Sequence, residues 1–131
     1  MSAGRPSGRV CAMVDRRDGY RCVRCGRSLA SFPGSRHHRR MRSQSDRAHA
    51  HDVENLILLC GSGTTGCHGW VHAHPADAYA LGLLVHSYED PAETPVDTWF
   101  GRVTPTPDGG YRRTGGERPE PAGNPDEWSR L

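Results

Sequence analysis

The sequence has little apolar material and no long apolar run. Only 34% of its 131 residues are hydrophobic, and it contains 16 glycines and 10 prolines. This composition predicts one small domain with a modest core. No segment approaches the roughly 20 consecutive apolar residues that span a bilayer, and there is no signal peptide. We therefore expect a soluble protein of the cytoplasm that does not bind membranes.

Lysine is absent, so all seventeen basic residues are arginine. Residues 1–48 carry twelve arginines against three acidic residues, a net charge of +9, whereas residues 49–131 carry five against twelve, a net charge of −7. Because a guanidinium group binds phosphate in a bidentate way, the basic first half favours a nucleic-acid partner. Genome composition is an alternative explanation for the choice of arginine, though not for its clustering.

Cysteine, by contrast, is plentiful for a chain of this size. Cys22 and Cys25 form a C-x2-C pair, and Cys60 and Cys67 form a second pair with six residues between them. In a reducing cytosol such pairs indicate metal ligands before disulfides. Four thiolates are the usual complement of a closed structural zinc site, which would stabilise a small core. We predict one structural Zn²⁺ bound by these four cysteines; the alternative is free buried thiols.

Local patterns predict a mixed α+β domain. Helices are expected at 9–18, at 67–73 and from Pro75 onward, strands at 35–39, 56–59 and 83–88, and a hairpin that pairs 99–103 with 110–113. The main domain is expected to span residues 9–90, followed by a short hairpin extension at 91–113. Residues 1–8 and 114–131 are rich in glycine, proline and polar residues and are predicted to be disordered.

Histidines form a second group of candidate functional residues. His37 and His38 are adjacent, and His68 and His72 share one face of the predicted helix at positions i and i+4. Hydrolysis of a phosphodiester needs a base that works near neutral pH, for which imidazole is suited, and a cation that neutralises charge on the phosphate. His74 competes with His72, but it lies on a different helix face from His68. His49 and His51 are predicted to face solvent in a polar loop.

From about Arg9 to Ser87 the chain resembles the HNH endonucleases, in particular the small zinc-containing type encoded by phages and prophages. The matching segments are CVRCG, HHRR, ENLILLC and GCHGWVH. The resemblance implies a ββα-metal (His-Me finger) fold, in which two strands and a helix hold one catalytic divalent ion against a phosphate. The strands would lie near 35–39 and 56–59, and the helix near 67–73.

The resemblance also implies roles for individual residues. His38 would be the general base, Asn55 would fix the loop that orients it, and the metal would be bound by His37, His68 and His72. Asn55 bonding its own backbone in a turn is the alternative for that residue. Exposure on the helix surface is the alternative for His68 and His72. The family's pair often begins with aspartate, and an all-imidazole set favours Zn²⁺, Ni²⁺ or Mn²⁺ over Mg²⁺, which prefers oxygen. The catalytic metal therefore stays open among these four ions.

The sequence thus predicts a metal-dependent HNH endonuclease that nicks or cuts double-stranded DNA with low intrinsic sequence specificity. Four arginines flank the predicted base and are expected to contact the DNA backbone: Arg36, Arg39, Arg40 and Arg42. The resemblance suggests phage DNA packaging or processing beside a terminase, by a monomer or weak dimer in the host cytoplasm. Two alternatives stay open: a non-enzymatic zinc module that binds nucleic acid, and a restriction-type HNH nuclease.

Overall fold

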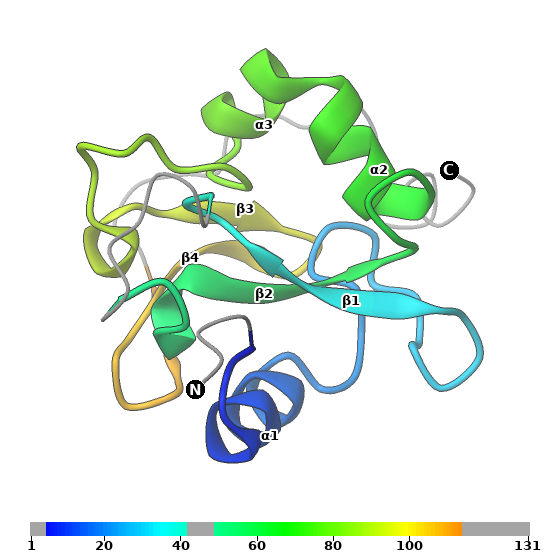
Figure 1. The fold of residues 1–131 in the computed structure, drawn as a ribbon, viewed down its shortest axis with the longest axis horizontal. Helices are drawn as coiled ribbons and strands as arrows, with labels where there is room; N and C mark the ends of the chain where they lie inside the picture. The colour runs from blue at the N-terminus through cyan, green and yellow to red at the C-terminus, as the bar shows by residue number, and fades with distance from the viewer. Residues whose placement is uncertain (1–4, 42–48, 114–131) are drawn as a thin grey trace.

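The computed structural model describes residues 5–41 and 49–113, which form a small mixed α+β structure (Figure 1). In chain order its elements are α1 (Gly8–Arg17), β1 (Gly34–His38), the 3-10 helix η2 (Val53–Asn55), β2 (Leu56–Cys60), α2 (Gly66–Ala73), α3 (Pro75–Ala80), the 3-10 helix η3 (Pro91–Glu93), β3 (Val96–Thr98), β4 (Gly101–Pro105) and β5 (Tyr111–Arg113). The strands form two antiparallel sheets, a β1–β2 pair and a three-stranded sheet in the order β3-β4-β5. Arg42 and the predicted tail at 114–131 lie outside the described residues.

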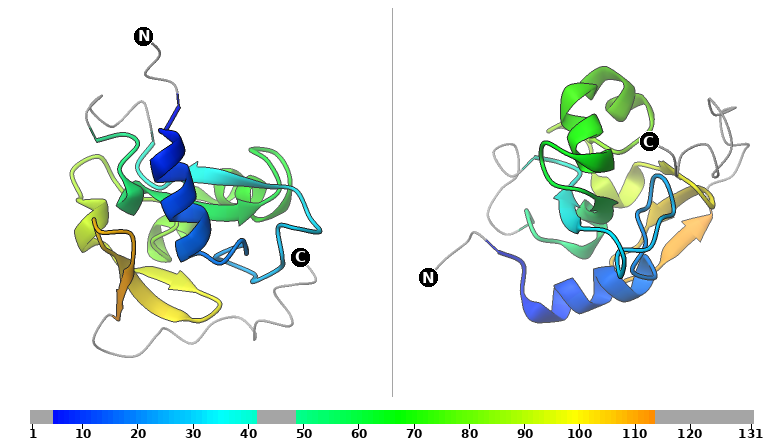
Figure 2. Two further views of the ribbon diagram at one scale, coloured as in Figure 1. Left: turned by 90° about the horizontal axis from the view of Figure 1, so that it is seen from below. Right: turned by 90° about the vertical axis from the view of Figure 1, so that its right-hand side faces the viewer.

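Strand β2 is buried along its whole length because helices cover both faces of the β1–β2 pair. Ile57 and Leu59 pack into the larger core with Val71 of α2, whereas Leu56 and Leu58 pack into a smaller core beside α1. Successive strand residues point to opposite faces, which explains the division. Figure 1 shows the pair between α2 and α3 on one side and α1 on the other, and in Figure 2 α1 crosses the pair when it is seen from below.

The register of the β1–β2 pair sends the two adjacent histidines to different faces. His37 lies opposite Ile57, and His38 lies opposite Leu56. Directly opposed residues of an antiparallel pair share a face. His37 therefore points toward the side of α2, together with Ser35, and His38 points toward the side of α1.

Helix α1 begins earlier than the sequence predicts. The side chain of Ser7 caps the helix by accepting a hydrogen bond of 3.2 Å from the backbone N–H of Val10, and Gly8 is the first helical residue. Such a cap satisfies a backbone donor that the first turn leaves without a partner. The prediction of disorder for residues 1–8 is therefore wrong at its C-terminal end.

A buried ionic network joins the end of α1 to the sheets. Arg17 donates to both the Asp18 carboxylate and the backbone carbonyl of Val53, the latter at 2.8 Å. Asp18 accepts hydrogen bonds from the backbone N–H of Leu58 at 3.0 Å and from the hydroxyl of Tyr111 at 2.5 Å. The side chains of Arg17 and Asp18 are almost inaccessible to solvent, so each charge depends on these partners.

The predicted strand at 83–88 is not formed. Leu83 and Leu84 donate their backbone N–H groups to the carbonyl of Ala78 at the end of α3, and Val85 donates to the carbonyl of Arg39 at 2.8 Å. The apolar residues at 83–85 are buried, but the helix end and the residue after β1 satisfy their backbone donors without a neighbouring strand.

The predicted hairpin forms between β4 and β5, and it is part of the domain rather than an extension. Strand β3, which the sequence does not predict, pairs with the other edge of β4. Val96 of β3 and Val103 of β4 are buried in the larger core, where the four cysteines and Ile57 also lie. The segment 91–113 therefore completes the core that supports β2.

Candidate functional site

Four cysteines, Cys22, Cys25, Cys60 and Cys67, are buried, and their sulfur atoms lie within 4.8 Å of one another. The Sγ atoms of Cys25 and Cys60 are 3.8 Å apart. Two thiolates bound at about 2.3 Å to one tetrahedral zinc ion would have about this separation. All four residues are free cysteines rather than disulfide partners. They are therefore close enough to hold a metal ion, and a four-thiolate donor set fits zinc.

The loop between Cys60 and Cys67 explains how a pair with six intervening residues joins this cluster. Gly61 and Gly66 have positive φ angles of 84° and 61°. A Cβ atom on Gly61 would lie 2.1 Å from the carbonyl oxygen of Thr65, and one on Gly66 would lie 2.6 Å from that of Cys60. Only glycine fits such a closely folded loop, which returns the start of α2 to the end of β2.

The surroundings of the cluster favour the thiolate form at two of the four cysteines. The backbone N–H of Cys67 donates to the sulfur of Cys60 at 3.3 Å, and the Arg24 guanidinium donates to the sulfur of Cys67 at 3.4 Å. Hydrogen bonding with Cys22 lowers the pKa of the Cys60 thiol and lowers that of Cys25 to about 7, whereas hydrogen bonding among the sulfurs raises the pKa of Cys22 and Cys67. Because the thiolate is the form that binds metal, these contacts prepare the cluster for an ion.

A second group of potential ligands consists of three histidines. His37 comes from β1, and His68 and His72 come from one face of α2; one ring nitrogen of each lies within 4.8 Å of the others. The ring centroids are 5.0 Å apart for His37 and His68, 4.9 Å for His68 and His72, and 5.8 Å for His37 and His72. His37 is buried, His68 is half-buried and His72 is exposed. The group is therefore anchored in the core and open to solvent at one edge.

Hydrogen bonds orient two of the three rings. Nε2 of His37 lies 2.8 Å from the carbonyl oxygen of Leu83, so it must carry the proton and donate, which leaves the lone pair on Nδ1. The hydroxyl of Ser35 donates to the carbonyl of Gly61 at 3.0 Å and lies 2.6 Å from Nδ1 of His68. Because the hydroxyl proton of Ser35 is already donated to Gly61, Nδ1 of His68 must carry a proton and donate it to the Ser35 oxygen. The lone pair of His68 is therefore on Nε2. Such partners set the tautomer of metal-binding histidines in proteins.

The same surroundings keep two of the imidazoles neutral. Burial lowers the pKa of His37 to about 3, and burial together with the neighbouring His72 lowers the pKa of His68. Both rings are therefore uncharged at neutral pH, which is the state that binds a metal ion. Three imidazoles with one open edge fit a zinc-type site in which water or substrate takes the remaining position.

His74, the sequence alternative to His72, is engaged elsewhere. Its Nδ1 donates to the backbone carbonyl of Trp70 at 3.0 Å, and its ring stacks on that of Trp70 at 4.9 Å. The guanidinium of Arg24 lies over the Trp70 ring at 3.9 Å. Of the two candidates, His72 joins the histidine group.

His38, the predicted general base, does not join the group of three. Its Nε2 lies 3.0 Å from Nδ1 of His51, and the two ring centroids are 5.1 Å apart. The prediction that His51 faces solvent is therefore wrong, because the ring is half-buried against His38. His49, by contrast, is exposed and pairs with Asp52 at 2.9 Å, as suits a residue of a polar loop. The sequence carries no local signal for the contact between residues 38 and 51.

Asn55 holds together the two ends of the loop that separates His38 from His51. Its side-chain oxygen accepts from the backbone N–H of Arg40 at 2.6 Å, and its amide donates to the carbonyls of Arg40 at 3.1 Å and Ala50 at 3.0 Å. The residue is completely buried. Two of its bonds reach across fifteen residues and the third across five, so the loop-fixing role describes it better than a local turn.

The arginines that flank His38 have different environments. Arg39 is completely buried, and its guanidinium donates to backbone carbonyls that include those of Gly82 and Pro91. The prediction that Arg39 contacts DNA is therefore wrong, because the group has no surface to offer to a phosphate. Arg36 forms an ion pair of 2.5 Å with Asp15 of α1 and stays partly exposed.

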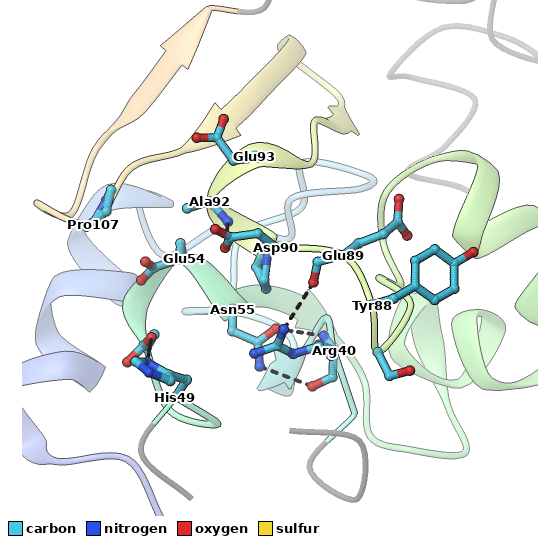
Figure 3. Close-up of a pocket in the computed structure, with 13 residues that line it drawn as sticks. Arg40, His49, Glu54, Asn55, Tyr88, Glu89, Asp90, Ala92, Glu93 and Pro107 are labelled. Atoms are coloured by element: carbon cyan, nitrogen blue, oxygen red, sulfur yellow. Dashed lines mark hydrogen bonds and ion pairs between the residues drawn. The ribbon is translucent and has the colours of Figure 1, made fainter. Parts of the chain in front are cut away.

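Arg40 lies in a cavity of about 630 Å³ beside Asn55. Figure 3 shows its guanidinium bonded to the carbonyl of Glu89, while Asn55 bonds its backbone. Five acidic residues line the cavity: Asp52, Glu54, Glu89, Asp90 and Glu93. This surface would repel a phosphate, so Arg40 is poorly placed to bind the DNA backbone from this side.

Comparisons of the chain with protein-family models, with curated proteins and with solved structures gave no match. Among residues 5–41 and 49–113, no helix has the length and apolar character needed to cross a membrane.

Proposed function

We propose that the protein is a metal-dependent endonuclease of the HNH type that hydrolyses phosphodiester bonds in DNA with little sequence preference. The observation that carries the proposal is the convergence of His37, His68 and His72, two of them oriented and neutral, from a strand and a helix. The elements β1, β2 and α2 follow one another in the strand-strand-helix order of a ββα-metal site. The chemistry of the donor set and its open edge support a catalytic rather than a purely structural ion.

The three histidines would hold a divalent ion, which supplies positive charge against the phosphate oxygens as negative charge builds on them. His38 would act as the general base that removes a proton from the attacking water. Its contact with His51 fixes the orientation of its ring, as an orienting partner does for a general base. Asn55 would support this pair by closing the loop behind it.

The position of His38 is compatible with a substrate that also reaches His37. His38 is the last residue of β1, so its ring lies at the end of the strand and not over the middle of a face. A phosphate bound at this end would meet a ring from each side of the strand. Of the predicted arginines that the structure describes, Arg36, partly exposed on the same strand, is the one best placed for a contact with the DNA backbone.

The four cysteines would bind a structural Zn²⁺. Cys67 directly precedes His68, and Cys60 is the last residue of β2, so an ion held by the cluster would fix both to the N-terminal Cys22–Cys25 turn. The proposed substrate is double-stranded DNA. By resemblance, the corresponding biological role is phage DNA packaging or processing beside a terminase.

A nicking assay on supercoiled plasmid tests the proposal. Purified protein is incubated with EDTA or with Mg²⁺, Mn²⁺, Ni²⁺ or Zn²⁺, and relaxed and linear products are separated on a gel. We expect cleavage with at least one ion and none with EDTA. The His38→Ala substitution should abolish DNA cleavage while the metal content and the melting temperature stay unchanged. DNA binding without cleavage under every condition would contradict the proposal and favour a non-enzymatic zinc module.

Two neighbouring histidines of the same helix provide a matched pair of variants. His72→Ala removes a proposed ligand and should lose cleavage together with one bound divalent ion per chain, measured by titration calorimetry. His74→Ala changes a ring that contacts Trp70 and lies outside the group of three, so it should cleave like the unaltered protein. If the two variants cleave DNA equally well, His72 is not a ligand of the metal.

A further inference from the structure

Three rings outside the proposed metal site form a parallel stack. The ring of Tyr79 in α3 lies 3.8 Å from that of His86, and the two planes differ by 1°. His86 in turn lies 5.1 Å from Tyr88, with planes that differ by 4°. Tyr79 and His86 are half-buried, whereas Tyr88 is 82% exposed. One face of the Tyr88 ring therefore rests on His86, and the other meets solvent.

The segment that carries this stack is tied to the strand end that carries the histidines. A turn between His86 and Glu89, closed by a backbone hydrogen bond of 3.0 Å, presents Tyr88. Three further hydrogen bonds join the segment to residues at the end of β1 and just beyond it: Leu83 O to His37 Nε2 at 2.8 Å, Val85 N to Arg39 O at 2.8 Å, and Glu89 O to Arg40 Nη1 at 3.0 Å. The Tyr88 ring is therefore held at a defined position relative to His37.

Charge around Tyr88 decides what kind of group can rest on it. Figure 3 shows Tyr88 and the carboxylate of Glu89 on one side of Arg40, with the carboxylates of Glu54 and Asp90 on the other side in this view. Tyr88 and these acids line the same cavity. A phosphate would be repelled there, whereas an uncharged planar group that stacks on the ring would not.

We propose that Tyr88 is a stacking platform for an unpaired nucleobase of the substrate strand, next to the phosphate that is cut. This inference rests on the proposed nuclease function and makes it more specific. Every base has a π-face, so stacking on an aromatic ring tolerates any sequence. The double-stranded substrate would then be locally opened beside the histidines, with one unpaired base on Tyr88 and its phosphate directed away from the acidic cavity.

Binding of a short single-stranded oligonucleotide that carries 2-aminopurine tests the platform without cleavage. The titration is made without added divalent metal, because stacking quenches the fluorescence of this base. Tyr88→Ala should lose the quenching and bind roughly five- to a hundred-fold more weakly, while Tyr88→Phe keeps the ring and should bind like the unaltered protein. Phe32→Ala removes an exposed ring that does not line this cavity and is the matched control. Since Tyr88 is largely exposed, its replacement should not affect folding, which circular dichroism checks.

The outcomes separate this inference from the nuclease proposal. Unchanged affinity and quenching in Tyr88→Ala would overturn the platform, even if the protein cleaves plasmid. If quenching depends on Tyr88 but the protein cleaves no DNA with any ion, the proposal that Tyr88 stacks on a nucleobase is supported and the nuclease proposal is wrong. If Tyr88→Ala instead weakens only the binding of an arginine-rich peptide, the ring serves a cation beside the carboxylates and the nucleobase proposal is wrong.

Discussion

Replacement of Asn55 by alanine should weaken both the fold and the proposed chemistry through one set of contacts. The buried side chain makes three hydrogen bonds, a buried one to the backbone of Ala50 and two part-buried ones to the backbone of Arg40. Alanine would leave one N–H and two carbonyl groups without these partners. Because these groups close the loop between His38 and His51, the loss should also disturb the contact between the two rings.

The magnitude follows from the number of bonds. A buried intramolecular hydrogen bond contributes about 1 kcal/mol net, and a buried backbone group left without a partner costs about 1 to 3 kcal/mol. Three such bonds predict a fall of about 3 kcal/mol in the free energy of unfolding, a large part of the total for a domain of this size. Asn55→Asp should be no milder, because its second oxygen would face two carbonyl oxygens that it cannot donate to.

Urea unfolding of the zinc-loaded protein measures the first effect, and the plasmid nicking rate measures the second. Val96→Ala in β3 is a suitable control, because the loss of two buried methyl groups costs about 2 kcal/mol or more without touching the loop. At a temperature where both variants are folded, Asn55→Ala should be much slower than Val96→Ala. Equal rates in the two variants, or a change in unfolding free energy below about 0.5 kcal/mol for Asn55→Ala, would refute the loop-fixing role.

Three further predictions concern stability. Cys22→Ser should release one zinc per chain and lower the melting temperature by at least about 10 °C, measured by metal analysis and calorimetry; an unchanged melting curve would count against a metal in the cysteine cluster. Asp18→Ala leaves the buried Arg17 guanidinium without its counter-charge and should cost about 3 to 5 kcal/mol in urea unfolding, and a loss below 1 kcal/mol would contradict the network. Burial lowers the pKa of His37 from its ordinary value of 6.5 to about 3, so between these two pH values the unfolded chain binds a proton that the native protein excludes. Metal-free protein should therefore lose up to about 1.4 kcal/mol of stability per pH unit below pH 6.5, relative to a His37→Gln variant that lacks this slope; parallel curves for the two proteins would show that His37 titrates normally.

Features that depend on local spacing could be predicted from the sequence. The prediction that the four cysteines lie close enough to hold a metal is confirmed. Cys60 and Cys67 come together because the loop between them has glycine where a side chain would not fit. His68 and His72 lie together because a helix brings residues i and i+4 to one face. The buried run at 56–59 was predictable because a strand covered on both faces is apolar throughout.

Features that depend on distant parts of the chain were not predicted. His51 meets His38 where Asn55 bonds Arg40 and Ala50, which lie within two residues of the two histidines, and no local sequence pattern indicates this contact. The run at 83–85 is as apolar as a buried strand, yet its backbone bonds to a helix end. The burial of Arg39 could have been predicted. In an extended strand, residues 37 and 39 lie on the same side, and His37 is buried.

The two adjacent histidines show how one strand could supply two chemical roles. His37 and His38 have identical side chains, but β1 sends them to opposite faces, where one is 2% exposed and the other is half-buried. Burial keeps His37 neutral, as a metal ligand must be, with its proton fixed on Nε2 by Leu83. His38 is half-buried at the C-terminal end of the strand with another imidazole as its partner, as suits a group that exchanges protons with water. In the proposed enzyme the strand's alternation therefore separates ligand from base, and a substitution that shifted the β1–β2 register by one residue would exchange their environments and abolish both roles.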